Sequence, residues 1–332
     1  MKTENIDNKV EGVDTLVKKY DILKKEIGKV IVGQDEIVRN VIISILSRGH
    51  CLLIGVPGLA KTLLVNTIAK TLGLTYSRIQ FTPDLMPSDI LGTEILDINQ
   101  DASHKREFRF IPGPLFGNII LADEINRCPP KTQSALLEAM EERAVTVAGK
   151  RYEMKAPFFV LATQNPIEQE GTYPLPEAQL DRFMFNVWLD YPSLEEELLV
   201  VKQTTSDQEV EVDVVLTAAE IIFYQELIRK IPVADNVMDY AVKLATNSRP
   251  SVNGASEESM VSKYLSWGAG PRASQFLIIG AKCNAAINGK YSPDIEDVQA
   301  VAKPILRHRI IRNYRAEADG VTVEDIIDEL MA

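Results

Sequence analysis

The stretch GVPGLAKT, residues 55–62, has the residue types of a phosphate-binding loop. Such loops read G-x-x-x-x-G-K-[ST], and here Ala60 replaces the second glycine. Lys61 can neutralise phosphate charge and Thr62 can bind magnesium, while backbone N–H groups at a helix start surround the phosphates. We expect a positive φ at Gly58 and, at Ala60, the negative φ of a starting helix, where a methyl group is tolerated. The stretch therefore predicts a working phosphate site.

Two carboxylates and an asparagine follow later apolar segments. Asp123 and Glu124 end NIILADE, where Asp123 is placed to hold hydrated magnesium and Glu124 to orient or deprotonate an attacking water. Asn165, in FFVLATQNP, could position the same water or contact the γ-phosphate, although asparagine before proline is also a common turn former. The presence of Glu124 favours hydrolysis over binding alone.

The apolar segments themselves predict strands that are buried on both faces of a sheet. They are CLLIG, NIILADE at 118–124 and FFVLATQNP at 158–166, and the amphipathic segment KTLLVNTIAKTLG directly follows the first. In an open parallel sheet, ligands collect beyond the carboxyl ends of the strands. We therefore predict an α/β fold in which the two carboxylates and the asparagine lie near the phosphate loop.

Two arginines are candidates to stabilise charge on a transferring phosphoryl group, because the guanidinium presents a fork of donors. Arg182 lies in EAQLDRF, and Arg272 lies in GAGPRAS. Each could equally form a surface ion pair, so their spacing in the sequence leaves both readings open.

The length of 332 residues, 45% of them hydrophobic, is sufficient for a large and a smaller domain, each able to bury its own core. We predict a polar tail over 1–13, a nucleotide-binding core over 14–191 and a helical domain over 192–332. Within the core we predict two hairpins, near 94–111 and near 145–154. The helical domain is predicted from a run of amphipathic segments that begins after Tyr191 and Pro192.

The composition limits the partners of the chain. Its 36 basic and 47 acidic side chains leave a net charge of -11, which argues against nonspecific binding to nucleic acid. Three cysteines without paired spacing suit a reducing cytosol. The N-terminus has no apolar signal region, and Ser47, Arg48, Gly49 and His50 interrupt the longest apolar stretch. We expect a soluble cytoplasmic protein without a membrane segment.

Five motifs, taken in order, resemble those of the MoxR family of AAA+ ATPases, in the helix-2-insert clade. They are GVPGLAKT, LADEINR, ATQNP, LPEAQLDRF and GAGPRAS. The resemblance implies a P-loop core with a parallel central sheet, followed by a small all-helical lid. It assigns Lys61 and Thr62 to Walker A, Asp123 and Glu124 to Walker B, Asn165 to sensor 1, Arg182 to the arginine finger and Arg272 to sensor 2. It further implies that the residues contacting the nucleotide are Val32, Gly33, Gly55, Gly58, Leu59, Ala60, Lys61, Thr62, Leu63 and Asp123.

The resemblance also implies an assembly and a task. The cofactors would be ATP and Mg²⁺, with Thr62 and Asp123 at the metal, and six subunits would form a ring in which Arg182 completes a neighbour's site. Whether Arg272 acts on its own subunit's nucleotide or on a neighbour's remains open. Relatives are similar to chaperones that mature other proteins, often with a von Willebrand factor A domain protein as partner.

Two other functions remain open from the sequence. One is a DNA-acting motor, which the basic residues Lys105, Arg106 and Arg109 near the first hairpin's turn favour and the net charge opposes. The other is a nucleotide-dependent assembly switch that binds ATP without appreciable hydrolysis, and Glu124 argues against it.

Overall fold

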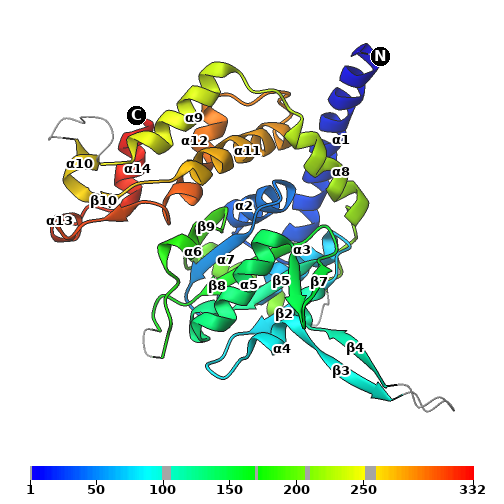
Figure 1. The fold of residues 1–332 in the computed structure, drawn as a ribbon. Helices are drawn as coiled ribbons and strands as arrows, with labels where there is room; N and C mark the ends of the chain where they lie inside the picture. Colours follow the sequence, from blue (N-terminus) through cyan, green and yellow to red (C-terminus); the bar gives the residue numbers. More distant parts are fainter. Residues whose placement is uncertain (1, 99–105, 169–170, 206–209, 251–258) are drawn as a thin grey trace.

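The computed structural model describes residues 2–98, 106–168, 171–205, 210–250 and 259–332 (Figure 1). Within this part of the chain, every helix is too short or too polar to cross a lipid bilayer. The turn NQDAS expected in the first hairpin and the basic residue Lys105 lie outside the described residues.

A sheet of five parallel strands forms the centre of the core, in the order β2-β5-β8-β1-β9. The strands are β1 (Cys51–Gly55), β2 (Tyr76–Gln80), β5 (Ile119–Asp123), β8 (Phe159–Gln164) and β9 (Phe185–Leu189). The three strands predicted from apolar runs are the three in the middle, and β2 and β9 form the edges. The carboxyl ends of all five strands therefore lie at one edge of the sheet, which we call the phosphate edge.

Alternate residues of the strands pack into two different cores. Leu53 and Leu121 belong to the core on one face, whereas Leu52 and Ile120 belong to the core on the other. The first face is covered by α1 (Lys2–Gly28), α2 (Asp35–Leu46) and α3 (Lys61–Thr71). The second is covered by α4 (Pro87–Leu91) and α5 (Pro130–Glu142). This double burial explains why the central strands read as continuous apolar runs.

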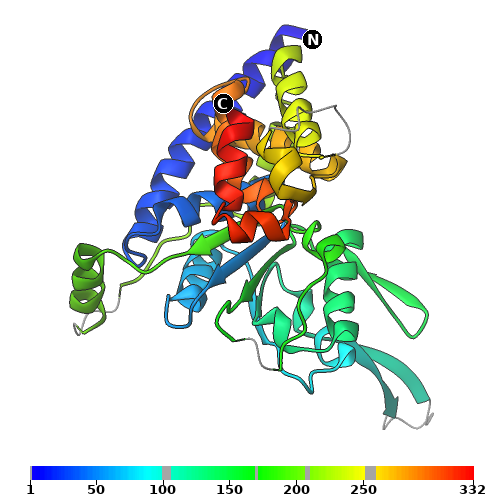
Figure 2. The same cartoon turned by 90° about the vertical axis from the view of Figure 1, so that its left-hand side faces the viewer.

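Two antiparallel hairpins leave the core on one side (Figures 1 and 2). The longer pairs β3 (Gly92–Ile98) with β4 (Arg106–Pro112), and the shorter pairs β6 (Ala144–Val147) with β7 (Lys150–Glu153). The shorter one turns at Ala148 and Gly149, both with positive φ, as tight hairpins require. Phe110 stacks on Tyr152 at 4.0 Å between ring centroids, so the two hairpins are in contact.

The N-terminal segment differs from the prediction of a polar tail over 1–13. Helix α1 begins at Lys2, and Val13 is buried. Gly12 lies so close to α8 that a Cβ atom there would come within 2.9 Å of Leu227. The polar composition of this segment concealed a helix that is supported by packing against α8.

The described part of the chain after Tyr191 is helical, with one exception. Its helices are α7 (Leu194–Thr204), α8 (Ala218–Arg229), α9 (Asp235–Asn247), α10 (Met260–Tyr264), α11 (Pro271–Ile287), α12 (Ile295–Leu306), α13 (Tyr314–Ala318) and α14 (Val323–Met331). The exception is a short antiparallel pair, β10 (Leu265–Trp267) with β11 (Ile311–Arg312). The prediction of an all-helical lid therefore misses this pair, whose strands are too short for a periodic pattern.

The lid does not have a separate core, in contrast to the prediction. The buried cluster that contains Leu53 and Leu64 of the nucleotide-binding core also contains Leu244, Leu277 and Ile326 of the lid. Helix α1 bridges the two parts because it packs against α3, α8 and α11. Helix α7 is different, since it has no buried residues and lies at the margin of the molecule, away from the other lid helices (Figure 2).

Candidate functional site

The phosphate loop connects β1 to α3 at the phosphate edge. Gly58 has φ of 89°, as predicted, and a Cβ atom there would meet no atom within 4 Å. Leu59 is buried and accepts a weak hydrogen bond of 3.4 Å from Gln34 through its backbone oxygen. Gly55 is fully enclosed, because a Cβ atom would come within 2.8 Å of Leu189 on β9. The loop is thus anchored at Gly55 and Leu59 and open at Gly58.

Ala60 does not have the conformation that we predicted. Its φ of 53° and ψ of 25° place it in the left-handed region, where it forms the N-cap of α3 instead of its first helical residue. A residue with a Cβ atom is strained there by about 1 kcal/mol, whereas glycine is not. The physical reason is that the chain must reverse direction before the helix can begin at Lys61. Ala60 therefore replaces the motif's glycine and also has the backbone conformation that favours glycine.

The first turn of α3 is suited to binding an anion. Ala60 provides no side-chain cap, whereas Ser193, Thr217, Asp294 and Thr322 cap α7, α8, α12 and α14 through their side chains. The first N–H groups of a helix have no partner within the helix, and the helix dipole adds positive potential. This fits phosphate oxygens.

Lys61 is half-buried beside the loop, and its ammonium group donates to the Gly55 carbonyl. Burial lowers the pKa of Lys61, while the negative charges of Asp123 and Glu124 act in the opposite direction. Thr62 and Leu63, the next residues of the helix, are exposed. The structure therefore brings Lys61 together with both predicted carboxylates.

Asp123 is held from two sides at the end of β5. Its Oδ1 accepts from Thr163 Oγ1 at 2.6 Å, and its Oδ2 accepts from Arg78 Nη2 at 2.8 Å and Nε at 3.1 Å. Thr163 lies on β8 and Arg78 on β2, the two neighbours of β5 in the sheet. The orientation of this carboxylate thus depends on two residues that the sequence did not single out.

Glu124 follows directly and has a left-handed backbone, with φ of 57°. Its N–H donates to Thr163 Oγ1 at 2.9 Å, and its Oε2 accepts from Gln80 Nε2 and Arg127 Nη1, each at 3.0 Å. The same threonine therefore fixes both acidic residues, whereas Gln80 and Arg127 orient only the Glu124 side chain.

Asn165 lies one residue beyond the end of β8, where Gln164 pairs with Ile54 of β1. It is buried, and its Oδ1 accepts from the N–H of Ile167 at 3.1 Å. Asn165 can therefore be a turn former and a functional residue at once, because its side-chain oxygen holds the turn while the residue lies beside the phosphate loop.

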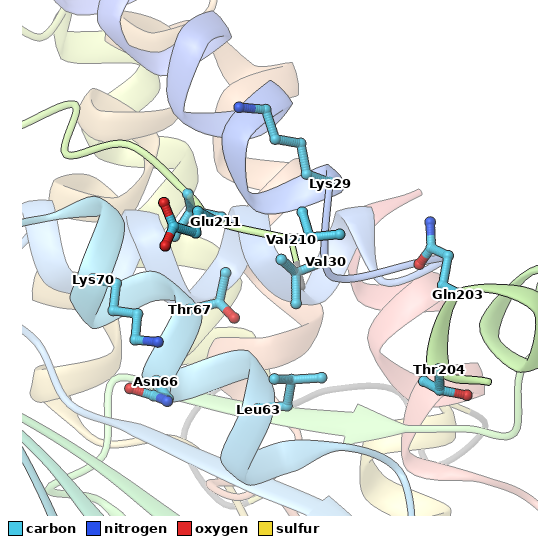
Figure 3. A pocket seen from close by; sticks show the side chains of 11 residues that line it. Lys29, Val30, Leu63, Asn66, Thr67, Lys70, Gln203, Thr204, Val210 and Glu211 are labelled. Carbon is cyan, nitrogen blue, oxygen red and sulfur yellow. The ribbon is translucent and has the colours of Figure 1, made fainter. Parts of the chain in front are cut away.

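Val32 and Gly33, predicted on the nucleotide's base side, lie in the connection between α1 and α2. Gly33 has φ of 72°, and a Cβ atom there would collide with Glu196 of α7 at 2.3 Å. Leu63 lines a neighbouring cavity of about 590 Å³ between α3, the end of α1 and residues 203–204 and 210–212 (Figure 3). Lys29, Lys70 and Glu211 carry charge at its walls, and the carboxylates of the site do not line it.

Arg182 and Arg272 lie together, but far from the other predicted residues. Arg182 precedes β9, whose first residue Phe185 pairs with Cys51 at the start of β1. The phosphate loop begins at the opposite end of β1, a strand length of roughly 16 Å away. We call this opposite margin the arginine edge, and from it neither arginine can contact the phosphate loop of its own chain.

A single glutamate connects the two arginines. Glu141 of α5 forms an ion pair with Arg182 Nη2 through Oε2 and accepts a hydrogen bond from Arg272 Nη2 through Oε1, each at 3.0 Å. Arg272 also pairs with Asp181 at 3.4 Å. A cavity of about 150 Å³ opens here, and its lining residues are Arg48, Gly49, His50, Met140, Glu141, Arg143, Arg182, Arg272 and Phe276. Within one chain, both arginines therefore form ion pairs, as one of the two alternatives from the sequence predicted. This is compatible with their acting on the nucleotide of another chain.

The sequence missed five residues that act on the site, and all of them except Arg127, which is three residues from Glu124, do so from an element remote in the chain. They are Arg78, Gln80, Arg127, Glu141 and Thr163. Thr163 could have been found, since it lies in ATQNP beside Asn165. Arg78 and Gln80 could not, because β2 is an edge strand whose half-exposed sequence YSRIQ lacks an apolar run.

The donor set also bears on magnesium. Among the described residues, no group of three or more His, Cys, Asp or Glu side chains could hold a metal ion by itself. Thr62 and Asp123 therefore fit Mg²⁺ only as two ligands beside phosphate oxygens and water, which is how magnesium is usually bound with nucleotides.

Comparisons with known proteins agree with this geometry. A family model described as "ATPase family associated with various cellular activities (AAA)" matches residues 50–185, and an "AAA lid domain" model matches residues 257–330. The chain is 43% identical over 309 residues to Chaperone MoxR1 of Mycobacterium tuberculosis, which covers 92% of this chain and 79% of that protein. It is 41% identical over 311 residues to the uncharacterized protein YeaC of Bacillus subtilis, covering 93% and 92%.

A solved structure is also similar. The crystal structure of a provisionally named ATPase from Cytophaga hutchinsonii superimposes with a TM-score of 0.89 at 42% sequence identity, covering 100% of this chain and 98% of that one.

Proposed function

Because the chain belongs to the MoxR family of AAA+ ATPases, we propose that it hydrolyses MgATP at sites formed between two copies of itself. The observation that carries the proposal is the separation of the arginine edge from the phosphate edge. Arg182 and Arg272 project from one margin of the sheet, and Lys61, Asp123 and Glu124 lie at the other. Head-to-tail contact between subunits would bring the two margins together.

Each residue then has a defined task. Lys61 and the uncapped N–H groups of α3 would bind the triphosphate, and Thr62 and Asp123 would hold Mg²⁺, which would neutralise charge on the phosphate oxygens. Thr163 and Arg78 fix Asp123, and Glu124 orients the attacking water and accepts its proton. Arg182 and Arg272 of the neighbour stabilise the charge that develops on the transferring group.

A head-to-tail contact between identical subunits closes into a ring or continues as a filament. We propose a closed ring, for which the family suggests six subunits. Both trans-acting arginines would come from the same neighbour, since Glu141 holds them together.

A protein client is the proposed target of the resulting motion. The β3–β4 hairpin extends from the core, and it exposes Phe108 by 67% and its cross-strand partner Leu96 by 45% (Figure 1). Exposed apolar pairs of this kind bind apolar segments of proteins better than they bind the phosphate backbone of DNA. The net charge of -11 also argues against a DNA-acting motor. We also propose a partner protein with a von Willebrand factor A domain, because the resemblance to the MoxR family implies one.

A cytoplasmic location also remains part of the proposal. Cys51, Cys128 and Cys283 are all buried and unpaired. Unpaired thiols suit a reducing compartment.

Mixing two inactive variants tests the shared site. Lys61→Ala removes a residue of the phosphate edge, and Arg182→Ala removes one of the arginine edge. Each variant alone should lose on the order of 10³-fold in kcat, whereas the mixture should regain activity at interfaces that combine an intact phosphate edge with an intact arginine edge.

Assembly of the mixture is verified by native mass spectrometry before ATP turnover is compared. Mixed assemblies that form and stay inactive would contradict catalysis between subunits. The double variant Lys61→Ala/Arg182→Ala is the matched control. It should regain nothing with either single variant, because no interface then combines an intact phosphate edge with an intact arginine edge.

A further inference from the structure

Arg309 of the lid reaches into the nucleotide-binding core and contacts the segment that carries Arg182. It lies in the turn between α12 and β11, and its side chain is 2% exposed. Its Nε donates to Asp181 Oδ1 at 2.7 Å, and its Nη2 donates to the carbonyl oxygens of Asp181 at 2.8 Å and Phe183 at 2.6 Å. Its Nη1 donates to the Met184 carbonyl at 3.3 Å. The guanidinium is thus bound to the residues on both sides of Arg182.

The segment 181–184 connects α6 (Glu177–Leu180) to β9, and the short α6 has no buried residues. The segment is held through its N–H groups by other parts of the core: those of Asp181, Arg182 and Phe183 donate back to carbonyl groups of α6, and that of Met184 donates to the His50 carbonyl at 2.8 Å. Its carbonyl groups are bound by Arg309, with His308 Nε2 also 3.0 Å from the Phe183 carbonyl. Because the three carbonyl groups flank the Arg182 Cα atom, fixing them fixes the direction in which the Arg182 side chain leaves the backbone. Arg309 therefore fixes the carbonyl side of the backbone from which the arginine finger starts, and Glu141 contacts the far end of the finger.

The same guanidinium also contacts the helix that carries Arg272. It lies over the ring of Phe276, 5.1 Å from its centroid, and Phe276 is one helical turn after Arg272 on α11. Asp181, the ion-pair partner of Arg309, pairs with Arg272 as well. One buried side chain thus ties the finger segment of the core to the lid helix that provides the second arginine.

We infer that Arg309 is the positioning residue of the trans-acting arginines, and that it transmits the orientation of the lid to the site of the neighbouring subunit. This inference rests on the proposed catalysis between subunits. Arg309 itself does not touch the nucleotide. Its side chain keeps the finger aligned, and any rotation of the lid against the core would move the segment 181–184 with it.

A purely structural role is the competing explanation, because a buried ion pair stabilises or destabilises a fold whatever lies nearby. The chemistry of arginine separates the two. Burial lowers the pKa of Arg309 to about 10, so the guanidinium is charged at neutral pH. A lysine ammonium has no planar fork, however, and cannot bind the carboxylate and all three carbonyl groups at once.

The test is the variant Arg309→Lys, whose ATP turnover is measured alone and in mixtures with Lys61→Ala or Arg182→Ala. A variant with a misplaced finger should lose about 10- to 100-fold in kcat, since displacements near 1 Å have effects of this size, and its KM for ATP should change little. Mixed with Lys61→Ala, it should regain activity, because its own phosphate edge is intact. Mixed with Arg182→Ala, it should regain none, because both variants lack a working finger. Arg312→Lys, at a lid arginine that donates to the Val321 carbonyl within the lid, is the matched control and should retain wild-type turnover.

Two outcomes would overturn the inference. If Arg309→Lys restores activity to Arg182→Ala, its finger works and Arg309 does not position it. If it restores none to Lys61→Ala while the pair Lys61→Ala and Arg182→Ala does complement, the defect lies in the fold and not in the finger. Failure of that reference pair would instead contradict the proposed function.

Should Arg309→Lys not fold, as judged by thermal unfolding with and without ATP, Asp181→Asn serves in its place. The Asp181 side chain is 32% exposed. The substitution preserves the backbone carbonyl and removes the charge with which both Arg309 and Arg272 pair. The same pattern is expected: activity regained with Lys61→Ala and not with Arg182→Ala. The reverse pattern would count against the inference.

Discussion

At the scale of single residues, the site is defined by two backbone conformations as much as by side chains. Ala60 and Glu124 are both left-handed, and each begins a helical turn at the phosphate edge. Such conformations cost about 1–3 kcal/mol in residues other than glycine, and they persist where the surrounding structure holds them. For Glu124 the support is visible, since Thr163 accepts from its N–H. The left-handed turn directs the carboxylate away from the strand and towards Gln80 and Arg127.

Replacing Ala60 by glycine should relieve this strain. We expect Ala60→Gly to raise the free energy of unfolding by roughly 0.5–1 kcal/mol, because glycine adopts positive φ without a steric penalty. Urea unfolding measures this change, and ATP turnover should change only modestly, since the N–H of residue 60 is preserved. Ala135→Gly, within α5, is the control and should lower stability by about 1 kcal/mol. A large gain in turnover would mean that the natural loop is impaired.

At the scale of elements, the arrangement depends on the parallel direction of the strands. It brings Asp123, Asn165 and the phosphate loop to one edge, and it sends Arg182 to the other. His50 lies at the arginine edge, where its ring connects two elements. Its Nδ1 accepts from the Val160 N–H of β8 at 3.0 Å, and its Nε2 donates to the Met140 carbonyl of α5 at 3.2 Å. The neutral ring satisfies both bonds, whereas a protonated ring would turn its Nδ1 proton against the Val160 N–H.

Acid should therefore weaken this junction. Burial lowers the pKa of His50 to about 4, against about 6.5 in the unfolded chain. Between these values the unfolded state binds a proton that the folded state does not, so stability falls as the pH falls from about 6.5 towards 4. The contribution lost at pH 5 is about 2 kcal/mol.

Urea unfolding at pH 7 and pH 5 measures this effect. His50→Asn keeps an acceptor for Val160 and should reduce the loss by that amount. Burial lowers the pKa of His308 in the same direction, and because His308 is present in both proteins, the difference reports on His50 alone. Equal losses in the two proteins would show that His50 does not set the acid sensitivity.

At the scale of the whole molecule, the lid and the nucleotide-binding core share one buried cluster. Motion between them therefore has to be small, or has to pass through the polar junction around Arg309, where the contacts are hydrogen bonds and ion pairs. The hairpins are coupled to each other by Phe110 and Tyr152 and by the pair of Lys150 with Glu94 at 3.2 Å. They would accordingly move as one unit against a client.

A trapped form should capture that client. We expect Glu124→Gln to bind ATP and assemble but to hydrolyse very slowly, because the neutral amide cannot accept a proton from water. A pull-down with this variant should recover a protein, and adding Phe108→Ser should reduce its recovery severalfold. Phe223→Ser, at an aromatic residue on α8 that is 50% exposed, should leave recovery unchanged. Near-normal turnover would remove Glu124 from its role, and salt-sensitive recovery of DNA would favour a nucleic-acid motor instead.

The order of motifs along the chain was sufficient to predict the α/β fold class, the family, the helical lid and the chemistry of the phosphate edge, and the comparisons confirm the first three. Local patterns carry this information because a buried strand, a glycine loop and an amphipathic helix each leave a periodic trace. The left-handed backbone of Ala60, the hold of Thr163 and Arg78 on Asp123, and the placement of Arg182 beside Arg272 emerged only from the tertiary structure. These features depend on which distant segments pack together and on the direction of the strands, and neither the spacing of residues nor their types specifies that.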